Sequence, residues 1–371
     1  MAIFDFGILR RGDVLLTIGI GALVAFGFSA IFSIELSRGS ENVFLQKQAI
    51  ALGMGIVVSV LIASMNYHIM RYGARGLYMV GIFLLIAVLL FGRTLNGSTG
   101  WFVVGGFAFQ PVEFMKVALV VVFAWYCSQK AMRRFSWRDL AMSGILVAIP
   151  VTLLMLQPDL GGAALLVGAW AIFILFAGIR VPQILAVCGL VLCVVSAGWF
   201  GVFDQYQKDR VLTFLDPSRD PLRTGYNVIQ AKIAIGSGEL WGRGLGDGSQ
   251  SQLRFLPESQ TDFIFAVIAE ELGFVGVCLL FVAFILVFWR MIVLARSASD
   301  TFGAYICIGA FSVIFTEVIV HVGANVSLMP ATGVALPFVS YGGSSLLLSF
   351  VFFGMVQSVA VRLHAADRVL L

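Results

Sequence analysis

The chain is organised around repeated apolar runs, most of them long enough to cross a lipid bilayer as a helix. A helix rises about 1.5 Å per residue, so about 20 apolar residues cross the roughly 30 Å of hydrocarbon in a membrane. Nine such runs lie near 14–34, 47–65, 76–92, 139–157, 160–179, 183–203, 262–289, 303–325 and 335–361, and a shorter tenth lies near 112–128. These runs predict an all-α, polytopic membrane protein of about ten transmembrane helices.

The composition agrees with lipid as the solvent for most of this surface. Hydrophobic residues make up 60% of the chain and charged residues only 12%, whereas soluble domains average about 25% charged residues. We therefore expect a single membrane domain over residues 1–371. The first run is too long for a signal-peptide core and further spans follow it, so we interpret it as a retained anchor.

Several other classes of protein are disfavoured. The net charge is only +4 and the basic residues are dispersed, which argues against nucleic acid as a partner. The five cysteines fall inside apolar stretches with no CxxC pair, and the three histidines lie far apart. These spacings predict neither a disulfide framework nor a zinc site.

Lysine and arginine in the short connections predict the orientation, because such residues concentrate on the cytoplasmic side. With the N-terminus inside, the inner segments carry thirteen basic residues and the short outer loops carry three. An even number of spans places the C-terminus inside as well. We therefore expect both termini in the cytoplasm.

Residues 204–261, between the seventh and eighth spans, form a large extracytoplasmic loop. The loop holds 14 charged residues in 58 positions, against 30 in the remaining 313. Loops of this length are usually functional or disordered. An amphipathic stretch, YNVIQAKIAIGSGEL, and the glycine-rich GRGLGDG favour a functional loop that contains an interfacial helix and a flexible turn.

Asp262 opens the eighth span directly after this loop. One interpretation is a helix N-cap, since aspartate accepts hydrogen bonds from backbone N–H groups there. The other is a carboxylate that faces a lipid headgroup and acts as a general base. Asparagine caps a helix about as well but cannot accept a proton, so Asp262→Asn separates the two.

Glu113 and Lys116 share one helix face at membrane depth. Intramembrane charges are costly and by default paired and functional, although a purely structural pair is the alternative. Asp159 at the next helix start is a candidate further partner for Lys116, or a simple N-cap. Glu317 and His321, four residues apart, form another polar pair without an assigned role.

The loop also carries basic residues that suit a pyrophosphate. The alternative for each is solvated charge, because seven acidic residues balance them in the same segment. We keep Lys208, Arg210 and Arg243 as candidates. The later run Ser340 to Ser345, SYGGSS, favours close packing of backbones in a membrane bundle.

Four motifs occur in the order typical of one family: FQPVEFMK, QPDLGG, the stretch from YNVIQAKIAIGSG to TDFIFAVIAEELG, and LPFVSYGGSS. The chain resembles the SEDS family of bacterial cell-wall glycosyltransferases over essentially its whole length. The blocks KIAIGSG and GSQSQL are more similar to the family's elongation members than to its division members.

The resemblance implies a peptidoglycan glycosyltransferase of the bacterial cytoplasmic membrane, which polymerises lipid II and works with a class B penicillin-binding protein. It implies Asp262 as the catalytic residue. It also implies a central cavity lined by Glu113 and Lys116, with Asp159 and Trp101 at matching positions. A divalent cation, Mg²⁺ or Mn²⁺, is compatible with the family; we name no metal ligands.

Some positions depart from the family pattern. Gly100 stands where the family usually has arginine, Val112 where it has serine, and His321 where it commonly has asparagine. A substrate-facing arginine is thus missing from its usual place. Two functions of other classes stay open: a transporter that flips lipid II, and a non-catalytic scaffold for the crosslinking enzyme.

Overall fold

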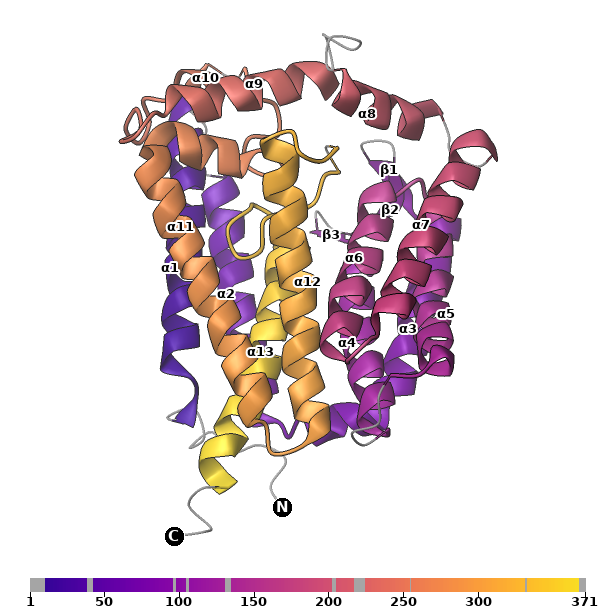
Figure 1. Cartoon of the computed structure of the whole chain (residues 1–371). Helices are drawn as coiled ribbons and strands as arrows, with labels where there is room; N and C mark the ends of the chain where they lie inside the picture. Colours follow the sequence, from indigo (N-terminus) through magenta and orange to yellow (C-terminus); the bar gives the residue numbers. More distant parts are fainter. Residues whose placement is uncertain are drawn as a thin grey trace.

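A computed structural model describes residues 11–38, 43–95, 98–104, 107–130, 135–201, 205–216, 224–253, 255–330 and 332–366. Ten long helices form the bundle in Figure 1. They are α1 (Val14–Arg38), α2 (Val43–Ser64), α3 (His68–Phe91), α4 (Pro111–Ser128), α5 (Trp137–Leu156), α6 (Leu160–Phe176), α7 (Val181–Gly201), α11 (Ile264–Ser297), α12 (Thr301–Asn325) and α13 (Gly343–Ala366).

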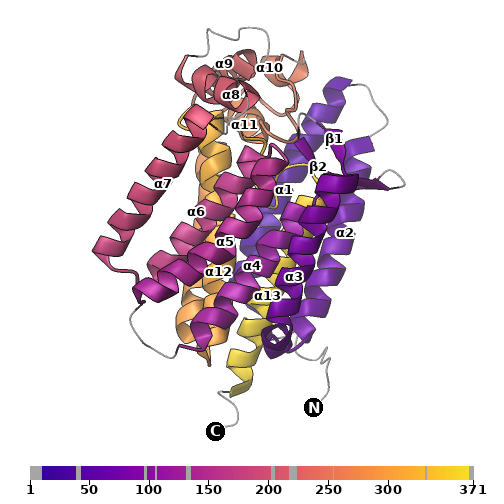
Figure 2. The ribbon, with the colours of Figure 1, turned by 90° about the vertical axis from the view of Figure 1, so that its right-hand side faces the viewer.

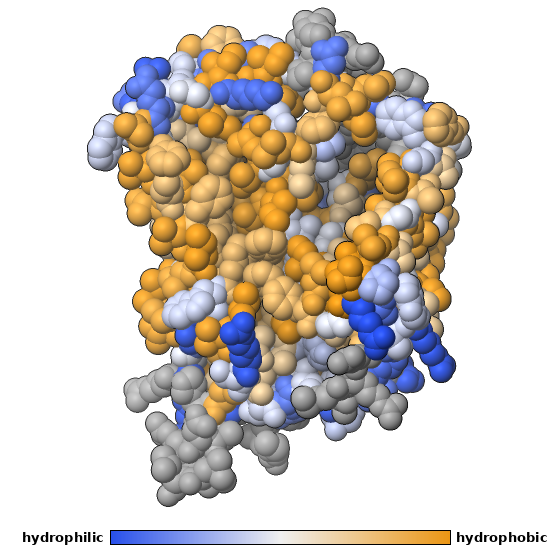
Figure 3. Space-filling view, in the orientation of Figure 1, coloured by the Kyte–Doolittle hydropathy of each residue, from blue (hydrophilic) through white to orange (hydrophobic). Residues whose placement is uncertain are grey.

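These helices confirm the predicted polytopic membrane fold. Among the described residues, nine helices are long and apolar enough to cross a membrane, and the tenth, α6, has 17 residues and is also apolar. A broad apolar belt surrounds the visible face of the molecule, and hydrophilic residues gather at both ends (Figure 3). The surface is therefore matched to a bilayer.

The two ends of the bundle differ. The start of α1 and the end of α13 lie at one end, which we call the termini end (Figure 1). Helices α8 (Gln205–Leu215), α9 (Thr224–Ser237) and α10 (Ser249–Gln252) cover the opposite end, which we call the loop end. The predicted extracytoplasmic loop thus contains three helices that form a layer over the bundle.

Three short strands add to the helices and refine the all-α prediction. β1 (Arg93–Leu95), β2 (Ser98–Val104) and β3 (Phe107–Phe109) form an antiparallel sheet between α3 and α4. The threonine, aromatic and valine residues of β2, STGWFVV, are of the β-branched and aromatic types that favour a strand. The sheet contacts the start of α13, where the Ser344 hydroxyl donates to the Ala108 carbonyl at 2.7 Å.

The predicted last span, 335–361, begins too early. Residues 335–342 are not helical, and α13 begins at Gly343. Phe338 has a φ of +64°, which lies outside the range of an uninterrupted right-handed helix. This stretch is nevertheless apolar and buried around Leu336 and Val339, because non-helical backbone at membrane depth must lie inside the protein. Hydropathy alone could not distinguish it from a helix.

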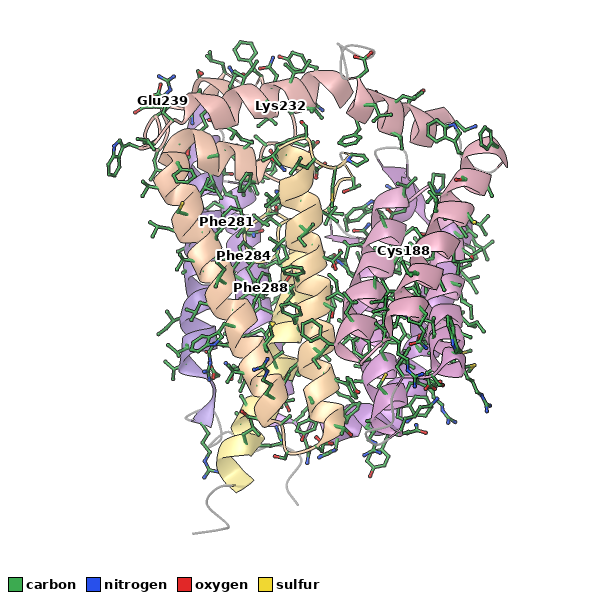
Figure 4. All side chains as sticks on the ribbon, in the orientation of Figure 1. Cys188, Lys232, Glu239, Phe281, Phe284 and Phe288 are labelled. Carbon is green, nitrogen blue, oxygen red and sulfur yellow. The ribbon has the colours of Figure 1, made fainter. Side chains whose placement is uncertain are left out.

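Helices α4, α12 and α13 occupy the centre of the bundle, with 72% of the spanning residues of each buried. Small residues allow the close approach of helices that membrane packing favours. A Cβ at Gly309 of α12 would stand 2.5 Å from Val120 of α4. On α11, Phe281, Phe284 and Phe288 lie along the bundle (Figure 4). The ring centroids of Phe288 and Phe311 of α12 are 5.4 Å apart.

Helix α7 stands apart from the rest. Figure 2 shows it inclined away from its neighbours, and only 6% of its spanning residues are buried. Its two cysteines, Cys188 and Cys193, are exposed, as is Cys278 on α11. All five cysteines are free in the structure.

Candidate active site

Asp262 lies in a tight turn that leads into α11 at the loop end. The N–H groups of Thr261 and Asp262 both donate to the Glu258 carbonyl at 3.1 Å, and Glu258 has a φ of +51°. Helix α11 begins at Ile264, its N-cap residue is Phe263, and no side chain caps it. Asp262 therefore does not occupy the cap position that one interpretation of the sequence assigned to it.

The main chain around Asp262 is held from two sides. From α12, the Asn325 amide donates to the Asp262 carbonyl at 2.9 Å and accepts from Ala266 N at 3.3 Å. From the segment before α13, the Ser340 hydroxyl donates to the Thr261 carbonyl at 2.8 Å. Because these bonds use backbone carbonyls, they position Asp262 without engaging its carboxylate.

The half-buried Asp262 carboxylate faces the segment 332–334, which connects α12 to α13. A Cβ at Gly333, whose φ is +73°, would stand 3.7 Å from Asp262 Oδ2. The first carbonyl of this segment would lie 2.4 Å from a Cβ at Gly161 of α6, so only glycine fits there. The carbonyl of its last residue lies 2.8 Å from His321 Nδ1. This segment therefore joins α6, α12 and Asp262.

A buried group of three charges lies deeper in the bundle. Lys116 Nζ is 2.7 Å from Glu113 Oε1 and 2.5 Å from Glu317 Oε1, and the Lys116 side chain is only 3% exposed. The predicted pairing of Glu113 with Lys116 is confirmed. The further partner is Glu317 of α12 and not Asp159. Two carboxylates face one ammonium group, so this cluster carries a net negative charge when all three are ionised.

One face of α12 connects this cluster to Asp262. Glu317, His321 and Asn325 are four residues apart and therefore share a face, and they span about 12 Å along the helix axis. The Asn325 amide also donates to the His321 carbonyl at 2.9 Å. His321 Nε2 is buried with no hydrogen-bond partner in the described part of the chain. The four-residue spacing of Glu317, His321 and Asn325 is visible in the sequence, but the bonds that Asn325 forms with the turn of Asp262 are not.

Asp159 acts as the N-cap of α6. Its Oδ1 accepts from Gly162 N at 2.8 Å, which is the structural alternative considered from the sequence. Its position at the start of α6, two residues before Gly161, places it near segment 332–334. A direct role for Asp159 with substrate stays a prediction.

Trp101 lies on β2, where it pairs with Arg93 of β1 and is half-buried. The sheet packs against α3 and α4, so Trp101 is carried on the same connection that leads to Glu113. The same sheet contacts the start of α13 through the bond from Ser344 to Ala108. A role for Trp101 with substrate stays a prediction.

The three loop cations differ in their placement. Arg243 Nε donates to the Ser237 carbonyl at 2.8 Å, so its exposed side chain binds the C-terminal end of α9, a favourable position for a cation. Lys208 is half-buried on α8, and Arg210 lies on the same helix with its side chain outside the described residues. Lys232 of α9 is exposed at the loop end (Figure 4). The contact of Arg243 is a structural one that the sequence did not reveal.

The glycine-rich segment is a well-defined part of the fold and not the flexible turn that we predicted. Helix α11 changes direction at Gly273, where φ is +65°, and residues 239–244 bind the exposed backbone of this break. Arg243 N and Gly244 N donate to two α11 carbonyls at 3.0 Å, and two N–H groups after the break donate back at 2.9 and 3.1 Å. A Cβ at Gly242 would stand 2.1 Å from an α11 carbonyl, so glycine is required for this contact.

Two adjacent buried carboxylates, Glu270 and Glu271, bind the segment GSQSQ to α11. Glu270 accepts from Gln250 N at 2.8 Å and from Ser251 N at 3.1 Å. Glu271 accepts from the hydroxyls of Ser251 and of Ser33 on α1. Two motifs that carried the resemblance therefore bind each other and hold the loop layer against the start of α11.

Near the site, Tyr341 of the SYGGSS run lies against Phe44 of α2 with ring centroids 5.0 Å apart. Gln48 of α2 accepts from Gly342 N at 3.2 Å and donates to the Ser340 carbonyl at 3.1 Å. This run is a structural support for the turn that holds Asp262.

The fold and the site together define a multi-pass membrane protein with an aspartate whose main chain is held in place at the loop end. A family model described as "Cell cycle protein" (FtsW, RodA, SpoVE) matches residues 11–365. The chain therefore belongs to the FtsW/RodA/SpoVE family, as its resemblance to the SEDS proteins predicts.

Curated relatives agree over nearly the whole chain. Stage V sporulation protein E of Bacillus subtilis is 35% identical over 354 residues, covering 93% of this chain and 94% of its own. Peptidoglycan glycosyltransferase MrdB of Escherichia coli K12 is 38% identical over 339 residues, covering 91% and 90%.

Solved structures show the same architecture. The rod shape determining protein RodA of Thermus thermophilus matches with a TM-score of 0.68 and 28% identity, covering 96% of each chain. A structure described as "Structural coordination of polymerization and crosslinking by a peptidoglycan synthase complex" matches with a TM-score of 0.77 and 30% identity, covering 98% of this chain and 99% of that one.

Proposed function

We propose that this protein is a peptidoglycan glycosyltransferase that polymerises lipid II during cell elongation, with Asp262 as the general base. The observation that carries the proposal is the fixed main chain of Asp262, held by Asn325 and Ser340 while the carboxylate itself faces segment 332–334. Relatives named peptidoglycan glycosyltransferase support the activity, and the blocks KIAIGSG and GSQSQL favour the RodA branch over FtsW.

In this mechanism the transfer inverts the configuration of the donor sugar. Asp262 takes the proton from the 4-hydroxyl of the acceptor GlcNAc as its oxygen attacks the donor's anomeric carbon. The bond from that carbon to the pyrophosphate oxygen breaks, and undecaprenyl pyrophosphate leaves with the electron pair. Because this leaving group is already a stable anion, no second carboxylic acid is needed to protonate it, in contrast to glycosidases.

Stabilisation of the leaving pyrophosphate is assigned to loop cations. Lys208 and Arg210 of α8 are the candidates, and Arg243 is a weaker one because it already binds the end of α9. In the part of the chain that the structure describes, no three His, Cys, Asp or Glu side chains are grouped so that they could hold a metal ion. The described residues alone therefore supply no three-ligand site for Mg²⁺ or Mn²⁺, and the mechanism assigns no step to a metal.

The decisive experiment compares purified wild type with Asp262→Asn in polymerisation of lipid II. Asparagine preserves the size of the side chain and leaves the backbone bonds to Asn325 and Ser340 in place. We expect the rate to fall by about 10²-fold or more, the usual contribution of a general base. Glu239→Gln removes an exposed carboxylate at the same end (Figure 4) and serves as the matched control, with an unchanged rate expected.

An Asp262→Asn protein that made glycan strands at the wild-type rate would show that the general-base assignment is wrong. Repeating both reactions with a chelator tests the metal question separately. Loss of wild-type activity with chelator would mean that a metal is required and that the substrate supplies part of its binding site.

The buried cluster of Glu113, Lys116 and Glu317 favours a second candidate, a transporter that flips lipid II. Intramembrane charges of this kind are common in transport pathways. Reconstitution in vesicles with lipid II distinguishes the two, because a transporter yields translocated but unpolymerised substrate. A non-catalytic scaffold would require that Asp262→Asn still support rod growth in cells.

We further propose an inner-membrane location with both termini in the cytoplasm and the loop end outside. The basic residues of the short connections support this orientation. The loop end would then meet a class B penicillin-binding protein, in keeping with the synthase complex to which this fold is similar. Leu240 is exposed at the loop end. In a protein without its native cysteines, we expect Leu240→Cys to react with a membrane-impermeant maleimide in intact cells.

A further inference from the structure

A basic and aromatic cavity opens at the termini end, far from Asp262 and the loop layer. It has a volume of about 590 Å³ and lies between the start of α3 and the end of α4. It is lined by His68, Arg71, Tyr72, Arg75, Trp125 and Gln129. Neither the proposed catalysis nor the family motifs use these residues.

The acids that the structure describes at this end leave the two arginines of the cavity without an ion-pair partner. Neither Arg71 nor Arg75 forms an ion pair with any residue that the structure describes. Asp300 accepts from Tyr67 OH at 2.7 Å and lies 3.8 Å from His68. Asp139 is paired with Lys130 and accepts from Ser136. Both guanidinium groups therefore remain available to an anion.

The arginines are also arranged for recognition. The Arg75 guanidinium stacks over the Trp125 ring, 4.5 Å from its centroid, which orients its N–H groups and adds a cation–π attraction. Arg71 is one helical turn away on the same face of α3. Planar guanidinium groups bind phosphate oxygens in pairs.

The cavity is reached from the lipid. Tyr72, Met79 and Phe83 of α3 are 89%, 63% and 68% exposed, and their spacing places them on one helix face. Acyl chains that follow this apolar face end beside Tyr72 and the arginines. Tyrosine and tryptophan favour this boundary between hydrocarbon and water.

We propose that this cavity binds the headgroup of an anionic phospholipid from the leaflet at the termini end. Basic pockets between membrane helices are known to take anionic headgroups. The occupant's phosphate would contact Arg71 and Arg75, and its chains would lie along α3. Such a site would anchor α3 and α4 to anionic lipid.

The test uses the purified full-length protein and native mass spectrometry. We expect phosphatidylglycerol to bind more tightly than phosphatidylcholine. The double variant Arg71→Gln/Arg75→Gln should bind it at least tenfold more weakly, since each basic residue near a membrane surface contributes about 1 kcal/mol, or roughly fivefold. The control Arg180→Gln/Arg296→Gln removes two exposed arginines at the same end and should bind it as wild type does.

Equal losses in the two double variants would overturn the proposal, because the binding would then be diffuse surface charge. Displacement of the lipid by inorganic phosphate at the same concentration would also overturn it, since the site would then take free phosphate. Should the double variant fail to fold, Arg75→Lys replaces it, because lysine keeps the charge and loses the planar contact. We expect this variant to bind phosphatidylglycerol more weakly than the wild type does, but more tightly than the wild type binds phosphatidylcholine. Wild-type affinity in Arg75→Lys would contradict the stacking argument.

Discussion

Helices α12 and α7 are similarly apolar, yet the structure uses them in opposite ways. In α12, 72% of the spanning residues are buried, whereas in α7 only 6% are. Helix α12 carries Glu317, His321 and Asn325 on one face and contacts α4, α6, α11 and α13. Helix α7 presents aliphatic side chains to its surroundings on nearly every side.

The difference teaches that hydropathy reports the ability to cross a membrane and not the place of a helix within the bundle. Lipid and protein interior are equally apolar, so burying a leucine against lipid or against protein yields little difference in transfer free energy. Position is decided by small residues that permit close contact and by polar groups that need partners. Helix α12 has both, and we expect substitutions on it to have larger effects than matched substitutions on α7.

The largest loss of stability is expected for Lys116→Met, which removes the ammonium group that Glu317 of α12 binds. Two buried carboxylates would lose their shared ammonium group, and breaking a buried ion pair costs about 3–5 kcal/mol. On α7, Leu190→Ala at a 62% exposed position should change the free energy of unfolding by less than about 0.5 kcal/mol. Denaturant titration of the protein in detergent measures both. Similar losses would mean that α12 is no more tightly integrated than α7.

A smaller effect is expected for Asn325→Ala. The change leaves the Ala266 N–H and the Asp262 carbonyl without their partner, at a cost of about 1–3 kcal/mol. It should also lower kcat for lipid II polymerisation more than it alters KM, because Asn325 positions Asp262 and does not bind substrate. Unchanged kcat with reduced stability would show that the bond supports the fold alone.

The last comparison is a matched pair of glycines, one on each helix, and the α7 member has the smallest expected effect. Gly309→Ala on α12 places a Cβ 2.5 Å from Val120 and should cost about 1–3 kcal/mol through overpacking. Gly189→Ala on α7 meets nothing within 4 Å, so it should stabilise the helix by up to about 1 kcal/mol. Thermal unfolding in the same detergent compares them. A destabilising Gly189→Ala would indicate that α7 packs against protein.

Much of the architecture was predictable because each span is a local property of about 20 residues. The long apolar runs, the loop at 204–261 and the Glu113 and Lys116 pair all follow from composition and helical spacing. The last span was misplaced at its start because residues 335–342 are as apolar as a helix, although Phe338 and the bonds of Ser340 hold them in another conformation.

The candidate site was predictable only in part. Asp262 and Asp159 both looked like helix caps, and the structure assigns that role to Asp159 alone. The glycine-rich segment looked flexible because glycine permits many conformations. Its partner, the break of α11 at Gly273, lies about 30 residues away, and the local sequence does not predict the contact between them.

The sequence by itself determined that the chain crosses a membrane about ten times, where its large polar loop lies and which family it belongs to, because these depend on local hydropathy and on motifs. Only the tertiary structure decided that Lys116 pairs with Glu317, that Asn325 holds Asp262 and that α7 stands apart. The physical reason is that hydrogen bonds, ion pairs and close helix contacts depend on the relative positions of distant segments, which hydropathy does not encode.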